Sequence, residues 1–85
     1  MKLLPKHPGQ VLSQMLTERE LTIAEFARTL SVSSSRISQI LSGKRRITVD
    51  SAFRIADVLN TTPDFWLDKQ KEYDIFMKNL SYSVV

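Results

Sequence analysis

Short hydrogen-bonding side chains are concentrated on one side of a helix predicted over residues 34–42, called here the reader helix. Hydroxyl, amide and guanidinium groups can bond to base-pair edges in the DNA major groove, which is wide enough for an α-helix. Ser is a poor helix former on a solvated face, so an idle Ser-rich surface helix is the weaker alternative. The polar side and its flanks carry Ser35, Arg36, Ser38, Gln39 and Ser42.

A run of three cations, Lys44–Arg46, follows the reader helix directly after Gly43. Gly43 suits the left-handed position that ends a helix. A bare charge run is usually solvated surface, but at this place it can reach phosphates beside the groove. Residues 1–47 hold eight Lys and Arg against three Glu, a balance of +5, whereas residues 48–85 hold four against six, a balance of −2. The first part of the chain is therefore suited to nucleic acid.

The reader helix needs a preceding helix and a turn to position it. Thr22 and Glu25 form a capping box that predicts a helix start at Thr22. Ser33 can cap the reader helix after a short turn. The helix-turn-helix core is therefore assigned to residues 22–46. The buried stripe of its first helix is expected to contain Ile23, Phe26, Ala27 and Leu30.

The chain is predicted to form one all-α domain over residues 8–80. Further helices are expected from Pro8 to about Glu18, over residues 49–59, and from Thr62-Pro63 onward. Phe53 lies beside the apolar stripe of the fourth helix and is expected to cover an edge of the core.

The two ends are predicted to lie outside the packed domain. Residues 1–7 are assigned to a flexible arm, in which His7 is expected to be a surface or capping residue. Residues 81–85 are assigned to a frayed tail.

Three consecutive apolar residues near the start of the fifth helix, Phe65, Trp66 and Leu67, cannot all face one core. Trp66 also shares a stripe with Tyr73, which is either core or a dimer seam. Below roughly 70–80 residues a single core rarely gives more than about 3–5 kcal/mol. This chain of 85 residues lies just above that range, so a second copy would help. We predict a homodimer through the C-terminal helix region, with an interface of Phe65, Trp66, Leu67 and Tyr73.

Several other functions are disfavoured by composition. The chain has no Cys and one His, which argues against a disulfide framework and a metal site. It shows no nucleophile–base pair and no Gly-rich phosphate loop, so no enzyme, cofactor or small-molecule substrate is expected. No apolar run approaches a membrane span, and the start resembles no signal peptide. We expect a cytoplasmic protein, associated with the nucleoid when bound to DNA.

The chain resembles the phage-repressor-like (XRE) helix-turn-helix proteins and, more narrowly, HigA-type antitoxins of bacterial toxin–antitoxin modules. The resemblance runs from about His7 to Asp74 and is carried by HPGQVL (7–12), by residues 21–67 and by the pair Tyr73-Asp74. Its specific parts are LSGKRRIT (41–48) and TPDFWL (62–67). It implies a five-helix fold and a homodimer on double-stranded palindromic operator DNA. It also implies autorepression of an operon and neutralisation of an mRNA-cleaving toxin encoded nearby. An orphan or phage-type repressor without a toxin is the alternative.

The resemblance also assigns residues to roles. Gln39 is best placed for a bidentate contact to adenine, and Arg36 could read guanine or hold a phosphate. Where phage repressors often have a phosphate-binding Gln this chain has Ile23, and where their turn usually has Gly it has Ser31. The implied base-reading residues are Ser34, Ser35, Arg36, Ser38 and Gln39. The implied DNA-backbone contacts are Thr22, Ser33, Ser42, Lys44, Arg45 and Arg46.

Overall fold

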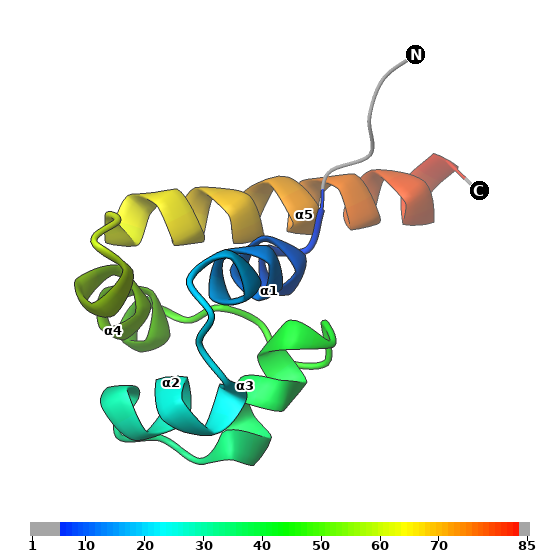
Figure 1. Ribbon diagram of the computed structural model, residues 1–85. Helices are drawn as coiled ribbons and strands as arrows, with labels where there is room; N and C mark the ends of the chain where they lie inside the picture. The colour runs from blue at the N-terminus through cyan, green and yellow to red at the C-terminus, as the bar shows by residue number, and fades with distance from the viewer. Residues whose placement is uncertain (1–5, 84–85) are drawn as a thin grey trace.

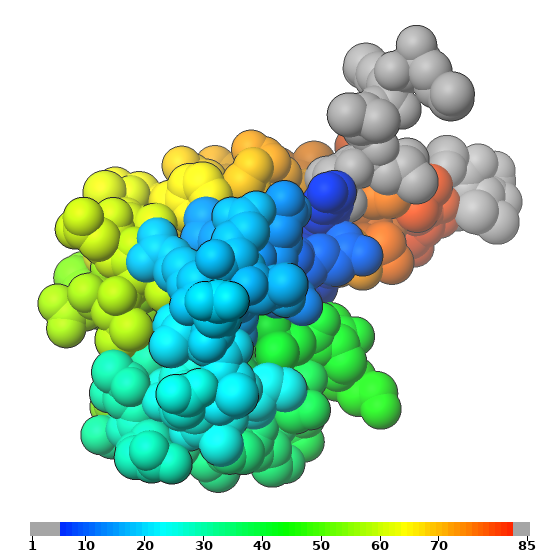
Figure 2. All heavy atoms as spheres, viewed as in Figure 1, coloured from blue at the N-terminus to red at the C-terminus, as the bar shows by residue number. Residues whose placement is uncertain are grey.

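Residues 6–83 are described by the computed structural model, and over this range the chain forms five α-helices and no strand (Figure 1). α2 and α3 lie together at one end of the molecule, and α5 runs along the opposite side (Figures 1 and 2). The all-α class with a helix-turn-helix is confirmed. The helices are α1 (Pro8–Glu18), α2 (Ile23–Leu30), α3 (Ser34–Leu41), α4 (Val49–Leu59) and α5 (Pro63–Ser83).

The starts of α2 and α3 follow from local side-chain bonds. The Thr22 hydroxyl accepts from the Glu25 backbone N–H at 3.1 Å, and the Glu25 carboxylate accepts from the Thr22 N–H at 3.0 Å. The Ser33 hydroxyl caps α3 by accepting from the Arg36 N–H at 3.1 Å. Each bond satisfies a backbone donor that has no partner within its helix. The expected stripe on α2 is wrong at Ile23, which is 38 % exposed because it lies at the first helical position, at the edge of the core.

The turn between α2 and α3 begins at Ser31, which adopts the left-handed conformation at φ 60° and ψ 41°. Two other non-Gly residues among those described have a positive φ. Glu20, in the loop between α1 and α2, has φ 56°, and Asn60, which caps the end of α4, has φ 57°. Gly43 ends α3 at φ 80°, as expected. These residues reverse the chain between helices, and each non-Gly case carries backbone strain.

One apolar core joins the five helices and includes Trp66 of α5. Trp66 is 0 % exposed, and its indole N–H donates to the Thr61 hydroxyl at 2.8 Å. The prediction that Trp66 forms the dimer interface is therefore wrong, because α5 packs this face against α1 and α4. The other buried apolar residues are Leu12, Leu16, Phe26, Ala27, Leu30, Ile37, Ile40, Ile47, Ala52, Ile55, Ala56 and Leu59.

The N-terminal segment is packed from His7 onward. The His7 ring is buried, and its Nδ1 accepts from the Gly9 N–H at 2.9 Å, which caps α1. Burial lowers the pKa of His7, against the opposing effect of the Asp74 charge. A Cβ at Gly9 would clash with the backbone carbonyl oxygen of Ile40, so Gly lets α1 and α3 approach closely. His7 is thus a capping residue within the domain, whereas residues 1–5 of the expected arm lie outside the described residues.

α5 is the longest helix and extends through most of the expected frayed tail. Residues 81–83 continue the helix to Ser83, because the chain there contains no Gly or Pro to end it. Residues 84 and 85 lie outside the described range. The C-terminal part of α5 projects past the other helices (Figure 1). Ile75, Met77 and Tyr82 on this part are exposed.

Candidate nucleic-acid interface

The three Ser side chains Ser34, Ser35 and Ser38 are exposed along the outer face of α3. The opposite face of the helix is fixed in the core by Ile37 and Ile40. α3 therefore presents short hydroxyl groups on a rigid support, at the end of the molecule away from α5 (Figure 2). Such a face can enter a major groove without long charged side chains in the way.

Gln39 is half-buried at the edge of this face and is surrounded by the loop that follows α3. Its backbone carbonyl accepts from the N–H groups of Lys44 and Arg45, at 2.9 and 3.2 Å, and from the Ser42 hydroxyl at 3.2 Å. The Arg45 Nε also donates to the Gln39 side-chain Oε1 at 3.0 Å. The structure therefore brings a predicted base-reading residue and a predicted backbone contact into one hydrogen-bonded pair.

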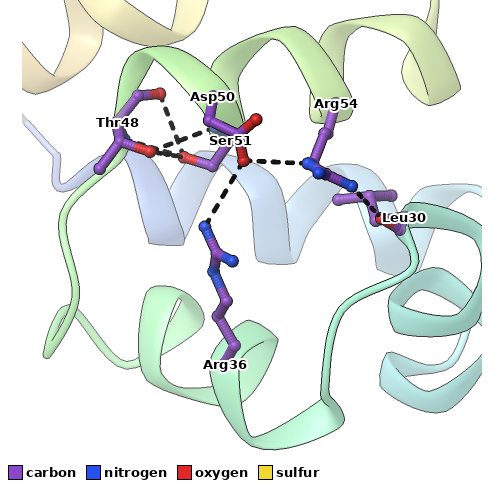
Figure 3. Close-up of polar contacts among 6 residues, drawn as sticks. All are labelled: Leu30, Arg36, Thr48, Asp50, Ser51 and Arg54. Atoms are coloured by element: carbon purple, nitrogen blue, oxygen red, sulfur yellow. Dashed lines mark hydrogen bonds and ion pairs between the residues drawn. The ribbon is translucent and has the colours of Figure 1, made fainter.

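Arg36 leaves the outer face of α3 and points toward α4 (Figure 3). Its Nη2 lies 3.9 Å from Oδ2 of Asp50. Asp50 also accepts from Arg54 Nε at 2.9 Å, and Arg54 Nη1 donates to the Leu30 carbonyl at 2.9 Å. These contacts link α2, α3 and α4 at the surface. An exposed ion pair is worth only about 0–1 kcal/mol, so a phosphate or base can compete for Arg36.

The three cations of the loop, Lys44, Arg45 and Arg46, have different partners in the structure, although they are adjacent in the sequence. Lys44 is exposed, and Arg45 is bonded to Gln39. Arg46 instead donates to Oδ2 of Asp74 on α5 at 2.7 Å, with side-chain exposures of 61 % and 40 %. The structure thus directs one predicted DNA contact toward α5, which sequence spacing could not reveal.

Asp74 belongs to a small network that fastens the α3–α4 loop to α5. Gln70 is buried, accepts from the Ile47 N–H at 2.7 Å and donates to Oδ1 of Asp74 at 3.0 Å. Partial burial would raise the pKa of Asp74, but hydrogen bonds from Arg46 and Gln70 and the charge of Arg46 lower it overall. Tyr73 packs edge-on against His7, with ring centroids 4.9 Å apart. The Tyr73-Asp74 pair therefore supports the loop behind the reader helix.

The predicted hydroxyl contacts to the DNA backbone all serve as local caps. Thr22 and Ser33 accept from helix N–H groups, and Ser42 donates to the Gln39 carbonyl. All three residues are exposed. Thr22 and Ser33 keep the hydroxyl proton for a phosphate oxygen, so capping and phosphate contact are compatible for these two.

Phe65, Leu67 and Tyr73 are only half-buried and pack on the core or on His7. Two large apolar side chains on α4, Val49 and Phe53, are much more exposed, at 61 % and 60 %. The expectation that Phe53 covers a core edge is wrong, because most of its side chain is exposed.

Phe53 stands beside a shallow hollow of about 260 Å³ between α4 and the start of α5. The position of Phe53 beside the apolar stripe of α4 is the feature of the sequence that indicates an apolar surface here. The hollow is lined by Phe53, Ala56, Asp57, Thr61 and Pro63.

Other kinds of site find little support over residues 6–83. No three His, Cys, Asp or Glu side chains in this range are grouped closely enough to hold a metal ion. None of the helices described here has the length and apolar character needed to cross a membrane.

The chain matches known helix-turn-helix proteins along most of its length. The helix-turn-helix family profile covers residues 12–66. The uncharacterized HTH-type transcriptional regulator YbaQ of Escherichia coli K12 is 37 % identical over 73 residues, which are 85 % of this chain and 65 % of YbaQ. The chain therefore spans just under two thirds of that relative.

Solved structures give a closer match in extent. An addiction module antidote protein of the HigA family from Coxiella burnetii has a TM-score of 0.84 at 35 % identity, over 96 % of this chain and 92 % of that one. Pseudomonas aeruginosa antitoxin HigA, solved with the higBA promoter, has a TM-score of 0.88 at 31 % identity, over 93 % and 87 %. With the exposed hydroxyl face of α3 and the basic loop behind it, the chain belongs to the helix-turn-helix family of DNA-binding transcriptional regulators and is structurally similar to HigA-type antitoxins.

Proposed function

We propose that this protein is an antitoxin that binds its own operator DNA, represses its operon and neutralises an mRNA-cleaving toxin encoded nearby. The observation that carries the DNA-binding part is the outer face of α3, with exposed Ser34, Ser35 and Ser38 held rigidly by the buried Ile37 and Ile40. The antitoxin part is supported by similarity to an addiction module antidote protein and to an antitoxin solved with a promoter.

On DNA, α3 enters the major groove and its polar side chains meet base edges. Lys44 and the free end of Arg45 lie beside the groove and neutralise phosphates, which makes the affinity fall steeply with salt. Ser34 and Ser35 bond to several kinds of base edge and so add less discrimination than Gln39. A homodimer places two copies of α3 about 34 Å apart, in successive major grooves of a palindromic operator.

The dimer surface that fits best is the exposed side of α4 and the start of α5. Phe53 is an exposed aromatic side chain next to a hollow lined partly by Ala56 and Pro63. In a two-fold dimer the same surface faces itself, so Phe53 of each copy can enter the hollow of the other. This surface replaces the buried Trp66 as the centre of the proposed interface, with Phe65 and Leu67 beside it.

Sedimentation equilibrium tests this surface. Phe53→Glu is expected to shift the protein to monomer, because a charge would be buried in the interface. Ile75→Glu is the matched control, since Ile75 is 51 % exposed on α5 away from the hollow. A dimer that survives Phe53→Glu but is lost in Ile75→Glu would move the interface to the projecting part of α5.

The toxin-binding surface is proposed to involve the acidic second half of the chain. An RNA-cleaving enzyme binds a polyanion and is commonly cationic near its site, so an acidic surface would attract it. The basic N-terminal arm, most of which lies outside the described residues, is a second candidate contact.

The runner-up is an orphan or phage-type repressor, which the similarity to the regulator YbaQ favours. Co-purification with the product of the adjacent reading frame, followed by footprinting on the upstream DNA, separates the two functions. A stable complex and a protected palindrome support the antitoxin. Protection without any complex supports the orphan repressor, and the absence of protection would refute operator binding. We place the protein in the cytoplasm, at the nucleoid when it is bound to DNA.

A further inference from the structure

The loop after α3 folds back onto the residue that is best placed to read a base. Three donors meet the Gln39 carbonyl oxygen: the Ser42 hydroxyl and the backbone N–H groups of Lys44 and Arg45. Gly43 makes this tight reversal possible with its φ of 80°. As a result the Arg45 side chain is held against the Gln39 side chain by the main chain itself, before any DNA is present.

The side chains then form one directed bond. Arg45 Nε donates to Gln39 Oε1 at 3.0 Å, and the donor carries a full positive charge. Charge-assisted bonds are shorter and stronger than neutral ones, so this bond fixes which end of the amide is the oxygen. The Gln39 Nε2–H2 group is left as the free end, and the guanidinium keeps its terminal N–H donors.

The bond to Arg45 changes which base the Gln39 side chain can pair with best. A bidentate contact to adenine needs Oε1 to accept from the adenine N6 amino group while Nε2 donates to N7. Arg45 occupies one of the two lone pairs of Oε1 and adds its own terminal N–H groups, so the pair as a whole presents more donors than acceptors. Guanine offers two acceptors in the major groove, N7 and O6, whereas adenine offers one acceptor and a donor that would face the free amide N–H groups.

We propose that Arg45 is a positioning residue that turns Gln39 from an adenine reader into a guanine reader. The inference rests on the proposed DNA binding and names the base that this part of the site prefers. It also separates Arg45 from Lys44, because among residues 6–83 only the backbone N–H of Lys44, and not its side chain, is found bonded to Gln39. A cation that only holds phosphate would lower the affinity for all sequences alike and leave base preference unchanged.

The test uses the full chain and a library of duplexes selected for binding from random sequence. Gln39→Ala identifies the base position that Gln39 reads, as the position where selection loses its preference. Fluorescence-anisotropy titrations at fixed salt then compare guanine with adenine at that position for the wild type, Arg45→Ala and Lys44→Ala. The Lys44 variant is the matched control, because it removes one charge from the same loop without touching the Gln39 amide. Circular dichroism melting checks that each variant is folded.

The wild type is expected to prefer guanine over adenine by roughly five- to a hundredfold, the range of one good bidentate pair. Arg45→Ala should abolish or reverse that preference, whereas Lys44→Ala should weaken both duplexes by the same factor. A wild type that prefers adenine, or an Arg45→Ala variant that keeps the guanine preference, would overturn the inference while leaving DNA binding intact. A wild type with no preference for any selected sequence would refute sequence-specific DNA binding itself.

Discussion

Replacing Ser31 with Gly should stabilise the protein, although it removes a side chain. Ser31 is exposed and lies at φ 60° and ψ 41°, where an L residue with a Cβ is strained by roughly 1–2 kcal/mol. Gly removes this strain but loses about 0.5–1 kcal/mol more conformational entropy on folding. The expected net gain is about 0.5–1 kcal/mol. In a domain of this size it corresponds to a rise in Tm of roughly 2–8 °C.

Thermal and urea unfolding, both followed by circular dichroism at 222 nm, measure this gain. Ser35→Gly is the matched control, because it makes the same chemical change inside α3, where Gly should cost roughly 0.5 kcal/mol relative to Ser. Asn60→Gly should give a smaller gain than Ser31→Gly although φ is similar, since Asn tolerates the left-handed region. A Tm for Ser31→Gly equal to or below that of the wild type would refute the argument that the turn stores this strain.

Three further changes test the packing behind the reader helix. Because burial lowers the pKa of His7, the unfolded chain binds a proton at this residue more readily than the folded chain does. The free energy of unfolding should therefore be highest above about pH 6.5 and fall as the pH drops below that value. The variant His7→Asn keeps a capping side chain and should lack this slope between pH 7 and 5 in urea titrations; an unchanged slope would assign it to other groups. Asp74→Asn should free Arg46 to contact a DNA phosphate. The slope of the logarithm of the DNA-binding constant against the logarithm of the salt concentration should then steepen by up to about 0.9. Asp68→Asn, on the same helix, should leave this slope unchanged. The same steepening in an Asp74→Asn variant that also carries Arg46→Gln would exclude Arg46 as its source. Gly9→Ala should lower the free energy of unfolding by about 1–3 kcal/mol, and a Tm within 1 °C of wild type would contradict the clash.

The features that the sequence predicted well depend on neighbours along the chain. The Thr22–Glu25 capping box, the Ser33 cap and the left-handed Gly43 each involve residues within three or four positions, and all are present in the structure. Local hydrogen-bond geometry is nearly the same in any fold, so residue type and spacing suffice to identify it. The helix-turn-helix follows from these caps and from helical periodicity.

The features that the sequence missed depend on which elements meet in three dimensions. Arg46 is followed by Asp74 twenty-eight positions later, and only the crossing of the α3–α4 loop over α5 brings them together. Three consecutive apolar residues predict an exposed interface at Trp66, because they cannot all face one core. The structure resolves the conflict by burying Trp66 fully and leaving Phe65 and Leu67 half-covered. The position of Phe53 was also not predictable from the sequence. An aromatic residue beside an apolar stripe can either cover the core or be exposed to solvent, and Phe53 is exposed.

The segment His7-Pro8-Gly9 at the start of α1 has a consequence for how related sequences are read. His7 caps the helix, Pro8 occupies its first position, and Gly9 makes room for the backbone of α3. Gly9 lies against Ile40 of α3, and the His7 ring lies near Gly43 at the end of α3, so this segment holds α1 beside α3. In other genomes, the tripeptide should therefore mark proteins that keep this helix crossing, including those whose reader helix has diverged to another operator or no longer binds DNA. Differences in operator sequence between such proteins should instead follow the residues on the outer face of α3.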